Sequence, residues 1–458
     1  MSSRVGHGSE PGVRSVVRPD AQALSVSLAV VSAVALVLGL IRLGTPSFWV
    51  DEAFTESEMR RSLIDTINAQ YHVLYYWIER PWSFVAGTSE AALRFPSVLG
   101  AMLAGSLMVV LGRRLFGPWV GLVSGLLVVS SPFVVQWSQQ TRGYTMLLAL
   151  VVGTTLLLLR ALERQSRLAW AVYGLAFTAV VVWQPVSGVL LFPSHAVLVA
   201  QRRESVLPHG LLAAVVIGAL AVPWAAVTAM RSTGEDVAMN WLKFPTGETV
   251  VRAVLDVSGA AGLGVALAGV GLVVLMRRGD RDLPIWLGVW AASPFVLALL
   301  VSFGRPIYLD RYLMVATPAF ALLAAAGIMG VRRGVRIALV VAVAVATVAG
   351  LAHWYSLAEE GNWHGEDWRR AVATVVDRRG EADATVVAPW SSAPAATYYG
   401  ADVVDVSKAD SIWVLRWSET GDDIAPAERA ALGFGEHRRV EKLDFGWRLS
   451  AQLWRRSE

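Results

Sequence analysis

The chain has 458 residues, of which 55% are hydrophobic and only 17% are charged, and its mean hydropathy is +0.50. Soluble domains carry about 25% charged residues, so a single ordinary soluble domain is excluded, and so is a disordered chain. The absence of cysteine excludes disulfides, iron–sulfur clusters and a thiol nucleophile, and the small net charge of +4 gives no reason to expect nucleic-acid binding.

The apolar residues are grouped in runs that predict about 11 membrane-spanning helices. Residues 1–21 are a polar tail, and the run 22–42 is too long for the apolar core of a signal peptide, so we interpret it as a retained first span. The other runs lie at 95–112, 118–136, 143–161, 168–185, 187–201, 209–229, 253–276, 284–303, 312–331 and 335–352. Residues 22–352 are therefore predicted to form a transmembrane domain.

Arginine clusters in every second loop predict the orientation. They are Arg113–Arg114, Arg164 and Arg167, Arg202–Arg203, Arg277–Arg278 with Arg281, and Arg332–Arg333 with Arg336. By the positive-inside rule these loops and the N-terminal tail are cytoplasmic, so that loops 43–94 and 137–142 face outward. The composition, rich in Ala, Val and Gly with only three lysines, is typical of a GC-rich bacterial genome. We therefore expect a bacterial plasma-membrane protein.

Residues 353–458 have the patterning of a soluble fold. An amphipathic helix begins at Glu366, and the later elements follow it in chain order. We expect short strands at 384–388 and 411–415, a helix at 425–432, and one or two closing strands at 438–455. These elements predict a small extracytoplasmic α/β domain. Its eight tryptophans fit core packing or membrane contact better than sugar stacking.

The first outward loop begins with two adjacent carboxylates, Asp51 and Glu52, directly after an aromatic stretch at the predicted membrane edge. Ionisable groups are costly at such a boundary and often mark functional sites. A partly desolvated carboxylate can act as a general base. The same residues also fit a helix N-terminus behind an interfacial tryptophan. His72 and Tyr75 follow in an aromatic cluster, which also fits an interfacial belt.

The second outward loop is unusually polar for a connection between spans. It contains Gln139, Gln140 and Arg142 and is followed by Tyr144. Substrate binding explains this polarity, and so does ordinary solvation of a helix end.

A late outward loop carries Arg305 and Tyr308, and Arg311 and Tyr312 open the next span. Positive charge on the outer side opposes the general bias, and the planar guanidinium suits phosphate. The alternative is a local ion pair of Arg311 with Asp310 or Asp51.

Together these motifs resemble the GT-C superfamily of integral-membrane glycosyltransferases, especially the branch of protein O-mannosyltransferases and aminoarabinose transferases. The resemblance covers roughly residues 22–352. It rests on Asp51-Glu52, His72 with Leu74-Tyr75-Tyr76, Ser138-Gln139-x-x-Arg142-x-Tyr144, and Arg311-Tyr312. The segment that starts at Glu366-Asp367-Trp368-Arg369 also resembles the small extracytoplasmic domain of bacterial members.

The resemblance implies a mechanism in which a polyprenyl-phosphate sugar arrives from the lipid and a glycan, lipid or protein acceptor arrives from the aqueous side. Asp51 would be the general base of an inverting transfer, and Glu52 would support it. The residues expected to bind substrate are His72, Tyr75, Gln139, Gln140, Arg142, Tyr144, Arg305, Tyr308, Arg311 and Tyr312. Among them Arg305, Arg311 and Tyr312 would meet the lipid phosphate. The sugar would be of the mannose or arabinose type.

One departure from the family pattern is Gln140, because many relatives carry a glutamate at this place. Without that carboxylate a divalent-metal site is weakened, although Asp51, Glu52 and His72 remain candidate ligands. We expect no obligatory metal cofactor.

Two other functions stay open at this point. A transporter or flippase of lipid-linked sugars would show inverted repeats and charges near the membrane midplane, whereas here the polar residues gather at one face. A non-catalytic membrane partner is favoured only by the missing second-loop carboxylate.

Overall fold

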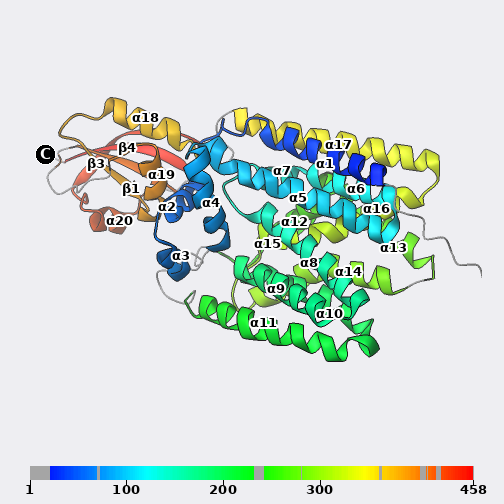
Figure 1. Ribbon diagram of the computed structural model, residues 1–458. Helices are drawn as coiled ribbons and strands as arrows, with labels where there is room; N and C mark the ends of the chain where they lie inside the picture. The colour runs from blue at the N-terminus through cyan, green and yellow to red at the C-terminus, as the bar shows by residue number, and fades with distance from the viewer. Residues whose placement is uncertain are drawn as a thin grey trace, which may run out of the picture.

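The computed structural model describes residues 21–69, 73–231, 242–279, 281–359, 364–402, 409, 411–418 and 424–456. Long helices form a bundle, and a small sheet lies at one end of it (Figure 1). His72, one of the candidate site residues, falls outside the described residues.

Seven helices in the described part of the chain are long and apolar enough to cross a membrane, or up to nine spans if two bent helix pairs are counted. The seven are α1 (Ala21–Leu40), α5 (Glu90–Phe116), α8 (Tyr144–Arg164), α11 (Arg203–Arg231), α14 (Asp282–Ser302), α15 with α16 (Asp310–Gly330), and α17 (Arg333–Glu359). The protein is therefore a multi-pass membrane protein.

The eleven predicted runs each coincide with a helix or a bent pair, but they do not all qualify as spans. The helices α9 (Arg167–Trp183) and α10 (Pro185–Ala200) have only 17 and 16 residues. A straight crossing takes about 20 residues. The number of 11 spans accordingly stays a prediction.

Two runs expected to be single helices are broken, which corrects the sequence prediction. Between α6 (Pro118–Val129) and α7 (Pro132–Ser138) the axis turns by 59°. Pro132 has no N–H with which to continue the ladder of α6, and it disfavours helical backbone at the residue before it. The bend carries the polar segment after α7 against the end of α1.

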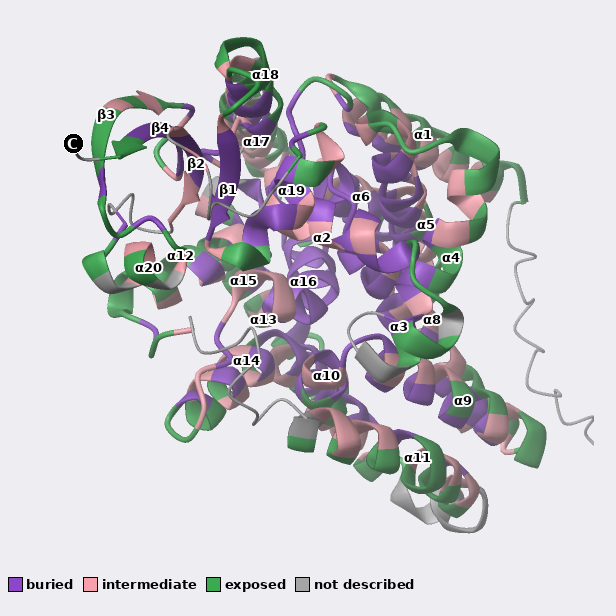
Figure 2. Cartoon of the chain, turned by 90° about the vertical axis from the view of Figure 1, so that its left-hand side faces the viewer, coloured by how far each residue is buried: buried purple, intermediate pink, exposed green. Residues whose placement is uncertain are grey.

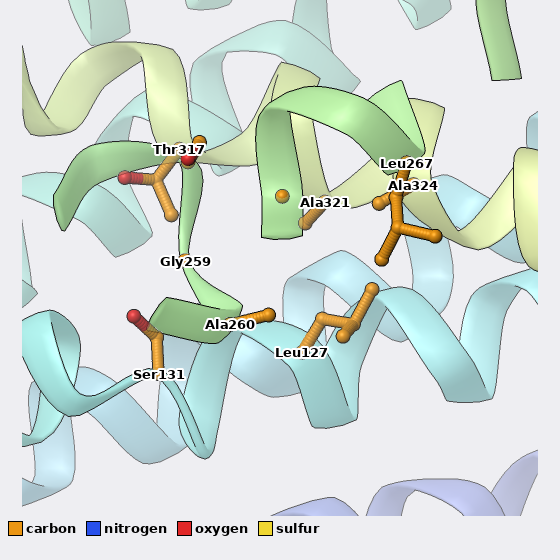
Figure 3. A pocket seen from close by; sticks show the side chains of 10 residues that line it. Leu127, Ser131, Gly259, Ala260, Leu267, Thr317, Ala321 and Ala324 are labelled. Atoms are coloured by element: carbon orange, nitrogen blue, oxygen red, sulfur yellow. The ribbon is translucent and has the colours of Figure 1, made fainter. Parts of the chain in front are cut away.

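The second break lies between α12 (Gly247–Ser258) and α13 (Leu263–Met276), where the axis turns by 66°. Gly259 and Gly262 have φ values of 76° and 91°, which residues with a Cβ rarely adopt. This break meets the first one at a small cavity of about 10 Å³, lined among others by Ser131, Gly259 and Thr317 (Figure 3). The irregular backbone is thus buried in protein, as the apolar membrane interior requires.

Three short helices fill the loop between α1 and α5. They are α2 (Val50–Met59), α3 (Leu63–Ala69) and α4 (Val73–Ala86), and they lie at the end of the bundle that carries the sheet (Figure 1).

The C-terminal sheet region, residues 364–456, contains a four-stranded sheet of order β1-β2-β4-β3. The strands are β1 (Ala384–Ala388), β2 (Ser411–Trp417), β3 (His437–Asp444) and β4 (Leu449–Arg456). The pair β1–β2 is parallel and the other pairs are antiparallel. The accompanying helices are α18 (Trp368–Arg378), α19 (Ala393–Tyr398) and α20 (Pro426–Ala431). Elements lie at the expected positions 384–388, 411–415 and 425–432, whereas α19 was not expected.

The loop formed by residues 43–94 shares its core with the sheet region. Phe48, Ala53 and Met59 are buried together with Trp368 and Trp413 in one apolar cluster. Helices α2 and α19 lie side by side at this end (Figure 2). Burial of apolar surface on both sides therefore holds α2 between the membrane bundle and the sheet.

Candidate active site

Asp51 lies in the first turn of α2 and faces two arginines from distant parts of the chain. Its Oδ2 atom is 3.7 Å from Nη2 of Arg142 and 4.0 Å from Nη2 of Arg311. The Asp51 side chain is 34% exposed, whereas both arginines are largely buried. The structure thus brings the first-loop carboxylate, the second-loop arginine and the late-helix arginine to one place, and the carboxylate is the most exposed of the three.

Glu52 points the other way and is fully buried. Its two carboxylate oxygens accept hydrogen bonds from Nε and Nη2 of Arg94, at 2.8 and 2.7 Å, and from the backbone N–H of Thr141 at 2.7 Å. Both oxygens are therefore occupied by the protein. Glu52 is a positioning residue that joins α2, α5 and the second loop, rather than a group that faces substrate.

Arg94 is a residue that the sequence interpretation missed. It is buried at the start of α5 and also donates to the backbone carbonyls of Leu43, Pro46 and Ser47. The only available signal was an arginine directly beside the apolar run 95–112. A buried charge needs a partner, and Glu52 is the partner here.

Gln139 was expected to bind substrate, but its amide ties helices together. Nε2 donates to the carbonyls of Gly39 and Ile41 at 3.0 and 2.7 Å, and Oε1 accepts from the Trp354 indole at 2.7 Å. These bonds satisfy the carbonyls left open at the end of α1. Gln140 is equally buried, and within the described residues neither its Oε1 nor its Nε2 has a partner.

Arg142 is oriented by α2 itself. Its Nη1 donates to the backbone carbonyl of Asp51 at 3.3 Å and to Oγ1 of Thr55 at 3.1 Å. Tyr144, which begins α8, is buried edge-on against Trp137 with ring centroids 4.7 Å apart. Tyr144 therefore packs under the loop, and Arg142 is the second-loop residue nearest the opening.

Tyr75 supports the second loop from below. Its hydroxyl is 3.4 Å from Oγ of Ser97, which in turn donates to the Arg142 carbonyl at 3.0 Å. At Gly143 a Cβ atom would lie 2.8 Å from the rings of Tyr75 and Trp183, so only glycine allows this close approach. Tyr75 thus contributes to the shape of the loop.

Of the candidate residues between 305 and 312, Arg311 lies at the Asp51 carboxylate, whereas Arg305 and Tyr308 lie in the connection that precedes it. Arg311, in α15 (Asp310–Leu313), lies over the ring of Trp137 at 5.8 Å and beside Tyr312 at 5.9 Å. Arg305 is half-buried in the connection from α14. Tyr308 is buried in that connection, and its hydroxyl has no partner in the part of the chain that the structure describes. Arg311 rather than Arg305 therefore joins Arg142 at Asp51.

Two residues of the C-terminal sheet region reach the start of α2. The His364 ring stacks on Trp49, with centroids 4.2 Å apart. Oε2 of Glu366 accepts from the Val50 backbone N–H at 3.1 Å and from the Trp368 indole at 2.9 Å. An acidic group at a helix N-terminus is favourable. The sheet region thus fixes the turn that carries Asp51, a contact that no sequence spacing indicated.

Burial changes the protonation of both residues. It raises the pKa of Glu366 to about 7, and hydrogen bonds from Trp368 and Val50 only partly offset it. Burial, together with the charges of Arg448 and Arg311, lowers the pKa of His364 to about 3, so this imidazole is neutral.

Another buried carboxylate was also missed. Glu79 lies in α4, close to the Tyr75 side chain. Burial raises its pKa to about 8, which keeps it protonated at neutral pH.

The raised pKa of Glu366 predicts that the stability of the protein depends on pH. Because its folded-state pKa of about 7 lies above the ordinary 4.5, the native state binds the proton more tightly, and the free energy of unfolding falls as pH rises between these values. The loss is up to about 3 kcal/mol. Thermal unfolding at pH 5 and 7.5 should show a clearly smaller decrease in Glu366→Gln than in the wild type, and the remaining decrease comes from Glu79, whose pKa is also raised. Glu441→Gln, which removes an exposed ion pair with Arg378, is the control and should show the full wild-type decrease.

Two of the candidate metal ligands, Asp51 and Glu52, already have partners in the protein. Among the described residues no group of three or more His, Asp or Glu side chains converges. Glu52 is bound to Arg94, and Asp51 faces two cations, which repel a further positive ion. Metal binding at Asp51 and Glu52 would require the buried ion pair to break.

The chain resembles known proteins in sequence and in fold. The family model of dolichyl-phosphate-mannose-protein mannosyltransferases matches residues 73–226, which include the second loop. No protein of curated function matches the chain in sequence.

The similar solved structures are membrane enzymes of low sequence identity. ArnT from Cupriavidus metallidurans, bound to undecaprenyl phosphate, has a TM-score of 0.60 at 14% identity, covering 93% of this chain and 97% of that one. Its apo form gives 0.62 at 14%, with coverage of 94% and 98%. The arabinofuranosyltransferase AftD from mycobacteria gives 0.52 at 13%, covering 94% of this chain and 40% of that chain. The chain therefore has the fold of the GT-C membrane glycosyltransferases and resembles the branch that contains ArnT and the protein mannosyltransferases.

Proposed function

We propose that the protein is a glycosyltransferase that moves a mannose- or arabinose-type sugar from a polyprenyl phosphate to a hydroxyl of a cell-envelope glycan, lipid or protein. The reaction takes place on the outer face of a bacterial plasma membrane, with the N-terminus in the cytoplasm and the sheet region outside. The observation that carries the proposal is the half-exposed carboxylate of Asp51, opposed by Arg142 and Arg311 at the end of an apolar bundle.

The chemistry follows from this opposition of charges. Asp51 takes the proton of the acceptor hydroxyl, whose oxygen then attacks the anomeric carbon. The bond from that carbon to the phosphate oxygen breaks, the electron pair stays on the phosphate, and the configuration inverts. Fixed positive charge stabilises the leaving phosphate. A lipid-borne phosphate accounts for a site at the membrane boundary.

The two arginines take different parts in this proposal. Arg142 is tied to the Asp51 carbonyl and to Thr55, so it orients the base. Arg311 opens the span Asp310–Gly330 and is the cation that a phosphate reaches from the lipid side. Tyr312 follows it directly, and Arg305 lies six residues before it. ArnT, the similar protein, is described as bound to undecaprenyl phosphate, which supports a polyprenyl phosphate as donor here.

The direct test is transfer by purified wild-type protein from a panel of radiolabelled polyprenyl-phosphate sugars. Release of polyprenyl phosphate that depends on an added acceptor supports the proposal. Failure to consume any lipid-linked sugar would overturn it and favour the non-catalytic membrane partner, which the glutamine at position 140 already suggests.

Arg311→Gln is expected to weaken binding of polyprenyl phosphate by roughly 30-fold or more, because loss of one member of a buried charge pair costs about 2–5 kcal/mol. Binding to protein in nanodiscs measures the effect. Arg252→Gln, which removes a 72%-exposed arginine of α12, is the matched control and should bind as the wild type does. Equal affinity of Arg311→Gln and the wild type would remove Arg311 from the phosphate site.

A further inference from the structure

The C-terminal sheet region has a hollow beside the start of α2 that the reaction described above does not use. Its volume is about 240 Å³, far more than the ~10–15 Å³ that one water molecule needs. Its lining is Arg416, Ser418, Lys442, Asp444, Gly446, Trp447, Arg448, Leu449 and Ser450. The hollow therefore admits an organic ligand.

Trp447 is the aromatic residue that lines the hollow. It is 59% exposed, although most tryptophans of the sheet region are buried or half-buried. It is nevertheless fixed in place, because the Arg448 guanidinium lies 4.3 Å from its ring and its indole closely contacts the backbone of Gly365. Exposing so large an apolar ring on a fixed support indicates a stacking surface.

The polar lining is matched to a neutral, hydroxyl-rich ligand. Each of the three cations of the lining lies near a carboxylate: Arg416 near Glu428 at 2.7 Å, Lys442 near Asp444 at 3.3 Å, and Arg448 near Glu366 at 3.8 Å. Such paired groups offer donors and acceptors side by side without a strong net charge. Together with the Ser418 and Ser450 hydroxyls and an indole face, this set suits a saccharide, whose ring has an apolar face and a rim of hydroxyls.

The hollow is also connected to the carboxylate of the reaction. The backbone N–H of Arg448 donates to the Gly365 carbonyl at 3.0 Å, and its Nη1 lies 3.8 Å from Oε1 of Glu366. Glu366 in turn accepts the Val50 N–H, one residue before Asp51. Arg448 and Glu366 therefore link the hollow to the turn that carries Asp51.

We propose that this hollow is a saccharide subsite that holds the acceptor glycan, with Trp447 as its stacking platform. The inference rests on the proposed function for its role in transfer, and it selects a glycan among the candidate acceptors. Binding of the saccharide itself requires neither donor nor turnover.

The test measures binding of short mannan and arabinan oligosaccharides to the purified full-length protein without donor, by calorimetry. Trp447→Ala is expected to weaken binding about tenfold, because the stacking contact contributes about 1 kcal/mol or somewhat more. Asp444→Asn, a substitution at a 66%-exposed position, should also weaken it. Trp390→Ala is the matched control, because Trp390 is a 66%-exposed tryptophan of the same region outside the hollow, and it should leave binding unchanged.

Kinetics then separate the two proposals. With an active donor, Trp447→Ala should raise KM for the glycan acceptor and leave KM for the donor and kcat unchanged. Transfer with unchanged acceptor KM in Trp447→Ala, or binding lost equally in Trp390→Ala, would overturn the subsite while the glycosyltransferase proposal stands. Oligosaccharide binding that depends on Trp447, in a protein that uses no lipid-linked donor, would keep the subsite and overturn the transferase. Failure of the wild type to bind any of the oligosaccharides would overturn the subsite.

Discussion

Asp51→Asn is expected to lower the rate of sugar transfer by about 10²- to 10⁴-fold, the contribution typical of a general base. The amide has nearly the same shape as the carboxylate but does not accept a proton at neutral pH. The packing around α2 should not change, because Glu52 rather than Asp51 makes the buried ion pair. The loss should appear in kcat, and binding of the donor should stay within a few-fold of the wild type, because Arg311 is still present.

Initial rates with a saturating lipid-linked sugar measure this effect. Asp65→Asn is the matched control: Asp65 is an exposed carboxylate of the same loop, hydrogen-bonded to Ser62 at 2.6 Å. Its rate should equal that of the wild type. Transfer that persists undiminished in Asp51→Asn would show that the base is another group.

The sequence predicted the membrane part of the fold because its signal is local. Each span needs about 20 apolar residues in a row, and such runs are visible without knowledge of their partners. The two breaks were not visible in this way. Pro132 stands within an apolar run that also reads as one helix, and Gly259 acts through its φ value, which hydropathy does not report.

The sequence predicted which residues gather at the candidate site, but not which of them face one another there and which bind other parts of the protein. Polar residues at the membrane edge are costly, so Asp51, Arg142 and Arg311 attracted attention by type and position, and they do meet. Gln139 attracted attention for the same reason, yet its partners are carbonyls about 100 residues earlier and an indole 215 residues later. Nothing in one sequence tells a polar group that faces substrate from one that satisfies a helix end.

The contacts between the sheet region and α2 could not be predicted from the sequence, for a related reason. His364 and Glu366 act on α2 across more than 300 residues of chain. Their contacts exist only because Phe48 and Trp368 are buried in one cluster. The pattern of short strands predicted the region itself, because alternation and turn residues are local, whereas the face that docks on α2 is decided by tertiary packing.

Arg94→Met is expected to cause the largest loss of stability, about 3–5 kcal/mol, because it leaves the Glu52 carboxylate buried without its partner. The substitution also deprives the carbonyls of Leu43, Pro46 and Ser47 of their donor. Arg94→Lys should recover little of this loss, since an ammonium does not reproduce the planar fork that binds both oxygens of Glu52. Thermal unfolding of the purified protein in one detergent measures these differences.

The double variant Glu52→Met with Arg94→Met distinguishes a lost ion pair from an unpaired charge. Replacing both charges removes the buried carboxylate, so the double variant should be more stable than Arg94→Met alone. It should still transfer sugar poorly, because the bond from Thr141 to Glu52 that aligns the second loop with α2 is also gone. Arg252→Met, at the exposed pair with Glu248, should change stability by less than about 1 kcal/mol. If Arg94→Met unfolded no earlier than this control, the ion pair would not be what holds Asp51 in place, and the position of the base would depend instead on the contacts that the sheet region makes with α2.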